Sequence, residues 1–211
     1  MIVRGRRLRT WAFRVVSALA VAAMATSIQP ASGTPFGVDP GGPGYLPDSQ
    51  DHWFCFDGSI PTGTEANRFY SGMEYLDSST LMYDVASSYC GSATDVIFRY
   101  QSPLAEAPGA RGYAPCRVRT GYANLFCEQG DVIVDVPQIW LDAGGWSGDP
   151  NTFELNIHKT VRHEIGHTAG LGHSSGVHAL ESGHVPYNWG YLAYLAHDIC
   201  HINTLYGGSA C

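Results

Sequence analysis

The sequence lacks the features of several protein classes. Only 15% of its 211 residues are charged, while 45% are hydrophobic and 12% aromatic, a balance that excludes an intrinsically disordered chain. It has no internal repeat and no low-complexity tract. Its longest apolar run is shorter than the roughly 20 residues that cross a membrane. These absences favour one globular domain with a core large enough to fold without stabilisation by disulfides or metal ions.

The first 33 residues differ in composition from the rest of the chain. "MIVRGRRLRTWAFR" has five arginines and no acid, an apolar stretch of eleven residues follows, and "TSIQPASG" supplies small residues that a signal peptidase accepts. We therefore expect a secretory signal peptide at 1–33, with an uncleaved anchor as the alternative. The general secretory route is favoured, because "GRRLRTW" matches a twin-arginine signal poorly. A Gly/Pro-rich lead-in at 34–50 then precedes one domain at 51–211.

Basic residues are scarce in the expected mature chain. Without the signal peptide, seven Lys and Arg face nineteen Asp and Glu, so the formal charge is −12 instead of −7. Such a surface repels nucleic-acid phosphates and anionic lipids. We therefore expect a secreted, extracellular protein that binds no nucleic acid, has no membrane anchor after cleavage, and is by default a monomer.

The six cysteines include no CxxC pair, which disfavours a structural zinc site built from thiolates. An even number of cysteines in an exported protein predicts three disulfides, although six cysteines allow fifteen connectivities. Short sequence separation favours two pairs and leaves a third: Cys116–Cys127, Cys200–Cys211 and Cys55–Cys90.

Helix-compatible and strand-compatible segments alternate before the last third of the chain. Residues 64–90 are mostly helix-compatible, with Ser78–Ser79 as a possible break or cap. Pro137 ends the last strand or places it at a sheet edge. β-Branched and aromatic residues predict two strands, at 94–100 and at 130–136. Between them, residues 113–127 are predicted to form a hairpin closed by its own disulfide.

Two further helices are predicted later in the chain. The first, at 151–170, begins at an Asn151 or Thr152 cap and ends at a left-handed Gly170. The second, at 195–207, ends at a glycine in the same way. The apolar stripe of the first repeats every four residues: Ile157, Val161 and Ile165. A helix, several strands and then two helices indicate an α+β domain.

The segment "HEIGHTAGLGH" has the spacing of a zinc site. His163 and His167 are four apart on the predicted helix, so their imidazoles share one face and can bind one ion. Glu164 lies beside that ion, where it can take a proton from a bound water. The turn at Gly170 returns His173 as a third ligand, and three imidazoles leave one tetrahedral position open. We predict one catalytic Zn²⁺ with Glu164 as general base; the alternative is a surface helix with incidental histidines.

This HExxHxxGxxH motif resembles that of the metzincin clan of zinc endopeptidases. "GLGHSS…AL…HDICHINTLYG" is similar to the matrixin branch, and the similarity covers residues 153–207. It implies an α+β fold with a twisted, mostly parallel sheet, an edge antiparallel strand, an active-site helix and a C-terminal helix. It also implies a protein or peptide substrate, bound as an added strand at the sheet edge near 130–136, with the same zinc ligands and base.

The resemblance breaks at the residue beneath the metal. Matrixins have a methionine eight residues after the third histidine, but counting from His173 gives Glu181, and no methionine follows Met82. Leu180 or Val185 could form the apolar floor, or Glu181 could be a metal ligand, as in another zinc-peptidase clan. The missing methionine also motivates two alternative functions: an exported zinc-binding module without efficient turnover, and a non-peptidase zinc amide hydrolase.

Other polar residues have two interpretations each. Tyr187 and His184, in the loop expected to wall the specificity pocket, are candidate oxyanion donors. Four acids could bind calcium or a second zinc, or form a solvated acidic surface: Asp131, Asp135, Asp142 and Asp149. The remaining histidines are expected to be solvated or to support the site: His52, His158, His178, His184, His197 and His201.

Overall fold

The computed structural model describes residues 45–61 and 63–209. The expected signal peptide and most of the lead-in therefore lie outside the described residues. The strands are β1 (Leu46–Pro47), β2 (Asp51–Phe56), β3 (Tyr83–Ala86), β4 (Val96–Tyr100), β5 (Gly112–Tyr113), β6 (Cys116–Thr120) and β7 (Phe126–Val134). The α-helices are α1 (Thr64–Ser79), α2 (Val136–Asp142), α3 (Pro150–Thr168) and α4 (Ala196–Leu205). In this part of the chain, no helix has the length and apolar character to cross a membrane.

The strands form one mostly parallel sheet in the order β1-β7-β4-β2-β3, and β5 and β6 pair antiparallel with β7. The expected fold class, a mostly parallel sheet with an antiparallel edge and helices, is confirmed. The substrate was expected at a sheet edge near 130–136, but the strand over that range is not itself an edge. β7 pairs with β4 on one side and with β5 and β6 on the other, so its backbone donors and acceptors are already used.

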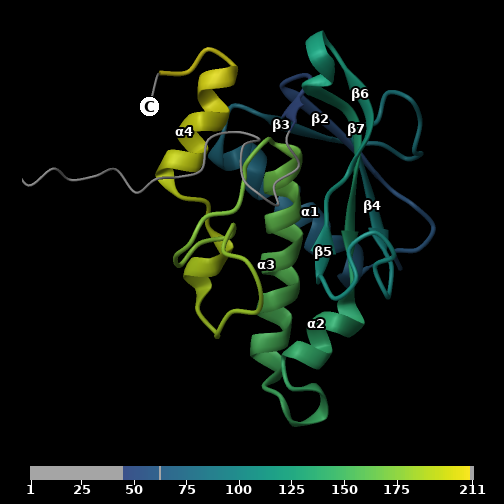
Figure 1. The fold of residues 1–211 in the computed structure, drawn as a ribbon, viewed down its shortest axis with the longest axis vertical. Coiled ribbons are helices and arrows are strands. Elements are labelled where there is room, and N and C mark those ends of the chain that lie inside the picture. The colour runs from purple at the N-terminus through teal and green to yellow at the C-terminus, as the bar shows by residue number, and fades with distance from the viewer. Residues whose placement is uncertain (1–44, 62, 210–211) are drawn as a thin grey trace, which may run out of the picture. The chain divides into compact units, whose positions relative to one another are not determined.

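Helices α1 and α3 run side by side next to the sheet, as Figure 1 shows. The predicted stripe of α3 is confirmed, because Ile157, Val161 and Ile165 are each fully buried in the main core. The two helices approach closely at Gly72 of α1, where an added Cβ would lie 2.6 Å from Ile165 Cδ1. Since this core fixes α3 against the sheet, it also fixes the side chains on the opposite face of α3.

Two segments differ from the predicted elements. The helix expected over 64–90 ends at Ser79, at the predicted serine break, where the Thr80 hydroxyl donates to the Leu76 carbonyl. Residues 83–86 then form the strand β3, which pairs with β2. A strand was not predicted at 83–86. β3 is an edge strand whose residues are exposed or half-buried, so it carries little hydrophobic signal.

The helix caps also differ in detail. Asp149, not Asn151 or Thr152, caps α3: its carboxylate accepts from the backbone N–H groups of both of those residues. Pro137 neither ends a strand nor lies at an edge, because it occupies the first turn of α2, where the missing N–H costs nothing. The predicted left-handed ends are confirmed at Gly170 (φ 87°) and at Gly207 (φ 84°).

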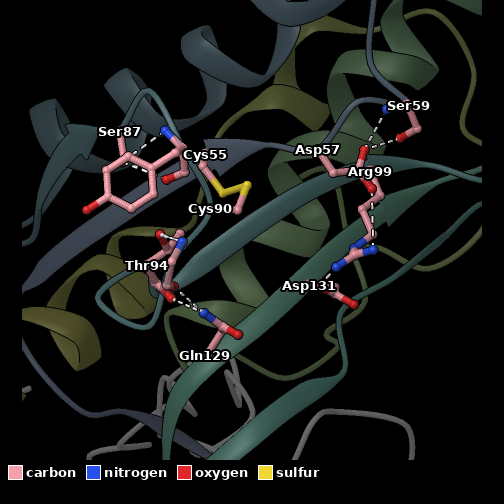
Figure 2. The surroundings of a disulfide bond; sticks show 11 residues. Cys55, Asp57, Ser59, Ser87, Cys90, Thr94, Arg99, Gln129 and Asp131 are labelled. Atoms are coloured by element: carbon pink, nitrogen blue, oxygen red, sulfur yellow. Dashed lines mark hydrogen bonds and ion pairs between the residues drawn. A yellow bond between two sulfur atoms is a disulfide. The ribbon is translucent and has the colours of Figure 1, made fainter.

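Two of the three expected disulfides lie within the described residues. Cys55 of β2 bonds Cys90, and Cys116 bonds Cys127 to close the β6–β7 hairpin. Figure 2 shows the first bridge, beside which the Gln129 side chain donates to the Thr94 carbonyl. Cys200 is also disulfide-bonded. Its expected partner, Cys211, lies outside the described residues.

Candidate metal centre

Three of the predicted site residues meet at one point. His163 and His167 project from the same face of α3, and the left-handed Gly170 reverses the chain so that His173 returns to them. One ring nitrogen of each lies within 4.8 Å of those of the other two, and the His167 and His173 Nε2 atoms are 3.1 Å apart. Among the described residues, this is the one group of three or more His, Cys, Asp or Glu side chains that could hold a metal ion.

Backbone carbonyls fix the orientation of the two helical imidazoles. The Nδ1 atom of His163 lies 2.9 Å from the Ala179 carbonyl oxygen, and Nδ1 of His167 lies 2.7 Å from that of Leu171. A carbonyl only accepts, so each Nδ1 carries the proton and each Nε2 presents its lone pair to the shared centre. Burial lowers the pKa of both imidazoles, that of His167 to about 4, which keeps them in the neutral form that binds metals.

Leu180 packs against α3 at Gly166, between the two helical histidines. Its side chain is buried against Gly166, where an added Cβ would lie 2.8 Å from Leu180 Cδ2. Val185 instead packs in a separate small cluster. The Glu181 carboxylate accepts from the Gly176 backbone N–H and is not part of the group of ligand atoms. Of the two aliphatic residues considered for the floor, Leu180 is the one that packs on α3 between the histidines.

Glu164 is buried beside the three histidines. Its carboxylate lies against Gly112 of β5, where an added Cβ would displace it, so the lack of a side chain at Gly112 leaves room for the carboxylate. Burial raises the pKa of Glu164 to about 8, and the positive charge of Lys159 opposes that rise. The group therefore combines a strong proton affinity with access to the cavity that it lines.

A cavity of about 720 Å³ opens onto the histidines and Glu164. Its other walls come from β5, the turn before it, α3 and the loop after the third histidine, and include Tyr45, Arg111, Gly112, Tyr113, Lys159 and Gly183. The volume is that of a pocket for a small molecule or a short peptide segment. The strand that lines the cavity is β5, which pairs with the end of β7 near 130–136.

Sequence reasoning missed two residues of this cavity. Tyr45 lies in the expected lead-in, yet it is buried and its hydroxyl donates to the Ala114 carbonyl over 2.8 Å. Lys159 precedes His163 by one helical turn and is the single lysine of the sequence. Its helical spacing of four from the first histidine was the signal that could have found it. No sequence signal places Tyr45 there.

The two candidate oxyanion donors are not among the residues that line the cavity with the histidines. Tyr187 lines a separate cavity of about 320 Å³ and contacts Trp189 edge to face. His184 is exposed. Of the other histidines, His52 and His178 are buried, not solvated, and each is hydrogen-bonded, His52 to Thr168 and His178 to a serine hydroxyl.

The four acids considered for calcium have separate structural roles. Asp131 is buried between Arg99 and Arg117, at 3.1 and 2.6 Å, and Figure 2 shows the first of these pairs. Asp142 pairs with Arg111 at 2.6 Å. The other two cap helices: Asp135 and Asp149. In the described part of the chain they do not gather into one ligand set.

Replacing Lys159 with Met is expected to raise the free energy of unfolding near neutral pH. Burial lowers the pKa of the ammonium from 10.5 to about 8, a shift that corresponds to about 3 kcal/mol. Below pH 8 the lysine is charged in both states, so the folded protein bears the full cost. As the pH rises toward 10.5, the folded state releases the proton first and the cost disappears. Denaturant titrations at pH 7 and 10.5 measure this, and a stability difference unchanged between the two pH values would contradict it.

Comparison with known proteins finds a partial similarity to one metalloendoproteinase. The chain is 33% identical over 73 residues to Metalloendoproteinase 1 of Glycine max, which covers 35% of this chain and 24% of the relative. No protein-family model matches the chain. The matched region is thus about a quarter of the relative's length. Together with the three-histidine group, this distant similarity supports a metalloprotease-like protein.

Proposed function

We propose that the protein is a secreted zinc-dependent endopeptidase. The observation that carries the proposal is the convergence of three imidazoles, two of them with tautomers fixed by backbone carbonyls, beside a buried carboxylate that lines an open cavity. Secretion is supported by the composition of 1–33 and by the disulfides, which persist in oxidising compartments. The distant metalloendoproteinase similarity agrees with this function.

The donor set fits zinc. Neutral imidazole nitrogens are preferred zinc ligands, and a site with three protein ligands keeps a position open for reaction. His163, His167 and His173 would hold the ion. The Nδ1–H groups of His163 and His167 donate to the Ala179 and Leu171 carbonyls, and these bonds correspond to the outer contacts that orient metal-binding histidines. A fourth protein ligand, which would close the site, is absent from this group among the described residues.

The chain's own residues account for proton transfer. Zinc, when bound, supplies positive charge that acidifies a water molecule, polarises a peptide carbonyl and favours the ionised form of a neighbouring carboxyl. Glu164 then accepts the proton of the attacking water and donates it to the leaving amine nitrogen. Lys159 assists by lowering the pKa of Glu164. The contact with Gly112 confines the Glu164 carboxylate, so the base is positioned before substrate binds.

The substrate is proposed to bind in extended form beside β5. Residues 112–115 line the cavity, and β5 pairs with β7 along one edge. In the sheet as described, no strand pairs with its other edge. An extended peptide can satisfy those backbone groups as an added strand, with its carbonyl placed near Glu164.

Removal of metal is expected to abolish cleavage. Dialysis of the purified protein against a chelator should eliminate hydrolysis of casein, and one equivalent of Zn²⁺ should restore it, because the remaining groups cannot polarise the peptide carbonyl. Peptidoglycan, assayed in parallel, tests the amide-hydrolase alternative. Cleavage that survives chelation with less than about 0.05 zinc per chain, or activity on peptidoglycan alone, would overturn the proposal.

A further inference from the structure

Lys159 is a buried cation in the wall of the active-site cavity. Only 3% of its surface is exposed, and it lines the cavity together with His163, which follows it by one turn of α3. Lysine is among the residues that are almost never fully buried without a partner. The position of this charge therefore calls for an explanation from its surroundings.

The surroundings give the ammonium little compensation. Its one hydrogen bond runs 3.3 Å to the Gly183 carbonyl, although an ammonium has three N–H donors. None of the ion pairs among the described residues includes Lys159. A buried charge without an anion destabilises the folded protein, so a position like this one is typical of a binding site for a charged ligand.

The charged groups that face Lys159 have other roles. These are Glu164, Glu181 and Arg111. Glu164 is the proposed base, and the Glu181 carboxylate accepts from the Gly176 N–H. The Arg111 guanidinium pairs with Asp142 at 2.6 Å, which neutralises it. No carboxylate of the described residues forms an ion pair with Lys159, so its ammonium is left to pair with a ligand, and its single charge matches a carboxylate better than a phosphate dianion.

We propose that Lys159 binds a substrate carboxylate next to the scissile bond, so that the enzyme selects peptides with an acidic group at that position. This inference rests on the proposed endopeptidase function and adds a substrate class to it. In an endopeptidase substrate that carboxylate belongs to an Asp or Glu side chain. A carboxylate placed there gives Lys159 an ion-pair partner, which none of the described residues provides.

Matched peptides test the inference with the zinc-loaded full chain. Each pair of fluorogenic peptides differs at one position, which carries Glu in one peptide and Gln in the other, and the position is moved in turn along the residues that flank the cleaved bond. Each pair gives the ratio of kcat/KM for Glu over Gln. For the wild type we expect a ratio of at least about tenfold at one position. In Lys159→Met the ratio should fall to about one, and in Lys159→Arg part of it should return. Arg119→Gln removes an exposed cation that also lines this cavity, and it should keep the wild-type ratio.

Two further arms identify the source of the carboxylate and the cause of a failure. A peptide that ends at the selected position is assayed as the free acid and as the amide; cleavage of the acid alone would assign a terminal carboxylate and would overturn the endopeptidase function. A wild type without Glu preference or acid preference, or an equal loss in the Arg119 variant, would overturn the role of Lys159. A wild type that cleaves none of the peptides would instead overturn the proposed function, and this inference with it. Zinc content and thermal unfolding confirm that each variant is folded.

Discussion

Glu164→Gln is expected to abolish cleavage of a denatured protein while zinc remains at about one per chain. Glutamine has the same shape and fits the same contact with Gly112, but its amide cannot accept the proton of the attacking water. General-base catalysis contributes about 10²–10⁴ in rate, so kcat should fall by at least that factor. Because Glu164 does not belong to the group of ligand atoms, metal binding should persist.

A second glutamate provides the matched control. Glu181 lies in the loop after the third histidine and hydrogen-bonds the Gly176 N–H, outside the ligand group. Glu181→Gln should therefore cleave the same substrate within about threefold of the wild type. Normal cleavage by the Glu164 variant, measured by initial rates with zinc content determined on the same sample, would show that the base is misassigned.

His173→Ala is expected to release the metal and with it the activity. Two imidazoles on one helix remain, and they provide one nitrogen fewer than the three-nitrogen sets of catalytic zinc sites. Loss of a residue that merely orients a ligand costs about 10–100-fold in metal affinity, so loss of a ligand should cost more than that. His173 is half-buried in a loop after α3, so circular dichroism should show an unchanged fold. A variant that keeps both zinc and activity would contradict the three-histidine assignment.

The elements that the sequence predicted are those whose own residues carry a strong local signal. α3 has a four-residue apolar repeat on one face and histidines on the other, and both faces occur as predicted. The left-handed end at Gly170 follows from glycine's freedom at positive φ. The β6–β7 hairpin was predicted because its closing disulfide, Cys116–Cys127, joins cysteines that are close in sequence.

The features that were missed depend on long-range contacts. β3 forms because β2 offers it a partner edge, and its own residues show no hydrophobic alternation. Lys159 has the helical spacing of the site, but its burial follows from the loop around Gly183 folding over it. The floor beneath the histidines depends on how Ala179 and Leu180 pack against α3, which counting residues from His173 could not decide.

The central claim, one zinc held by three histidines, is tested most directly by metal content. Wild type, His173→Ala and Glu181→Ala are purified in parallel without added chelator, and zinc per chain is measured by plasma mass spectrometry. The geometry predicts about one zinc in the wild type and in Glu181→Ala, and a small fraction of that in His173→Ala. Zinc that is retained without His173 but lost without Glu181 would contradict the account and move the third ligand to the glutamate.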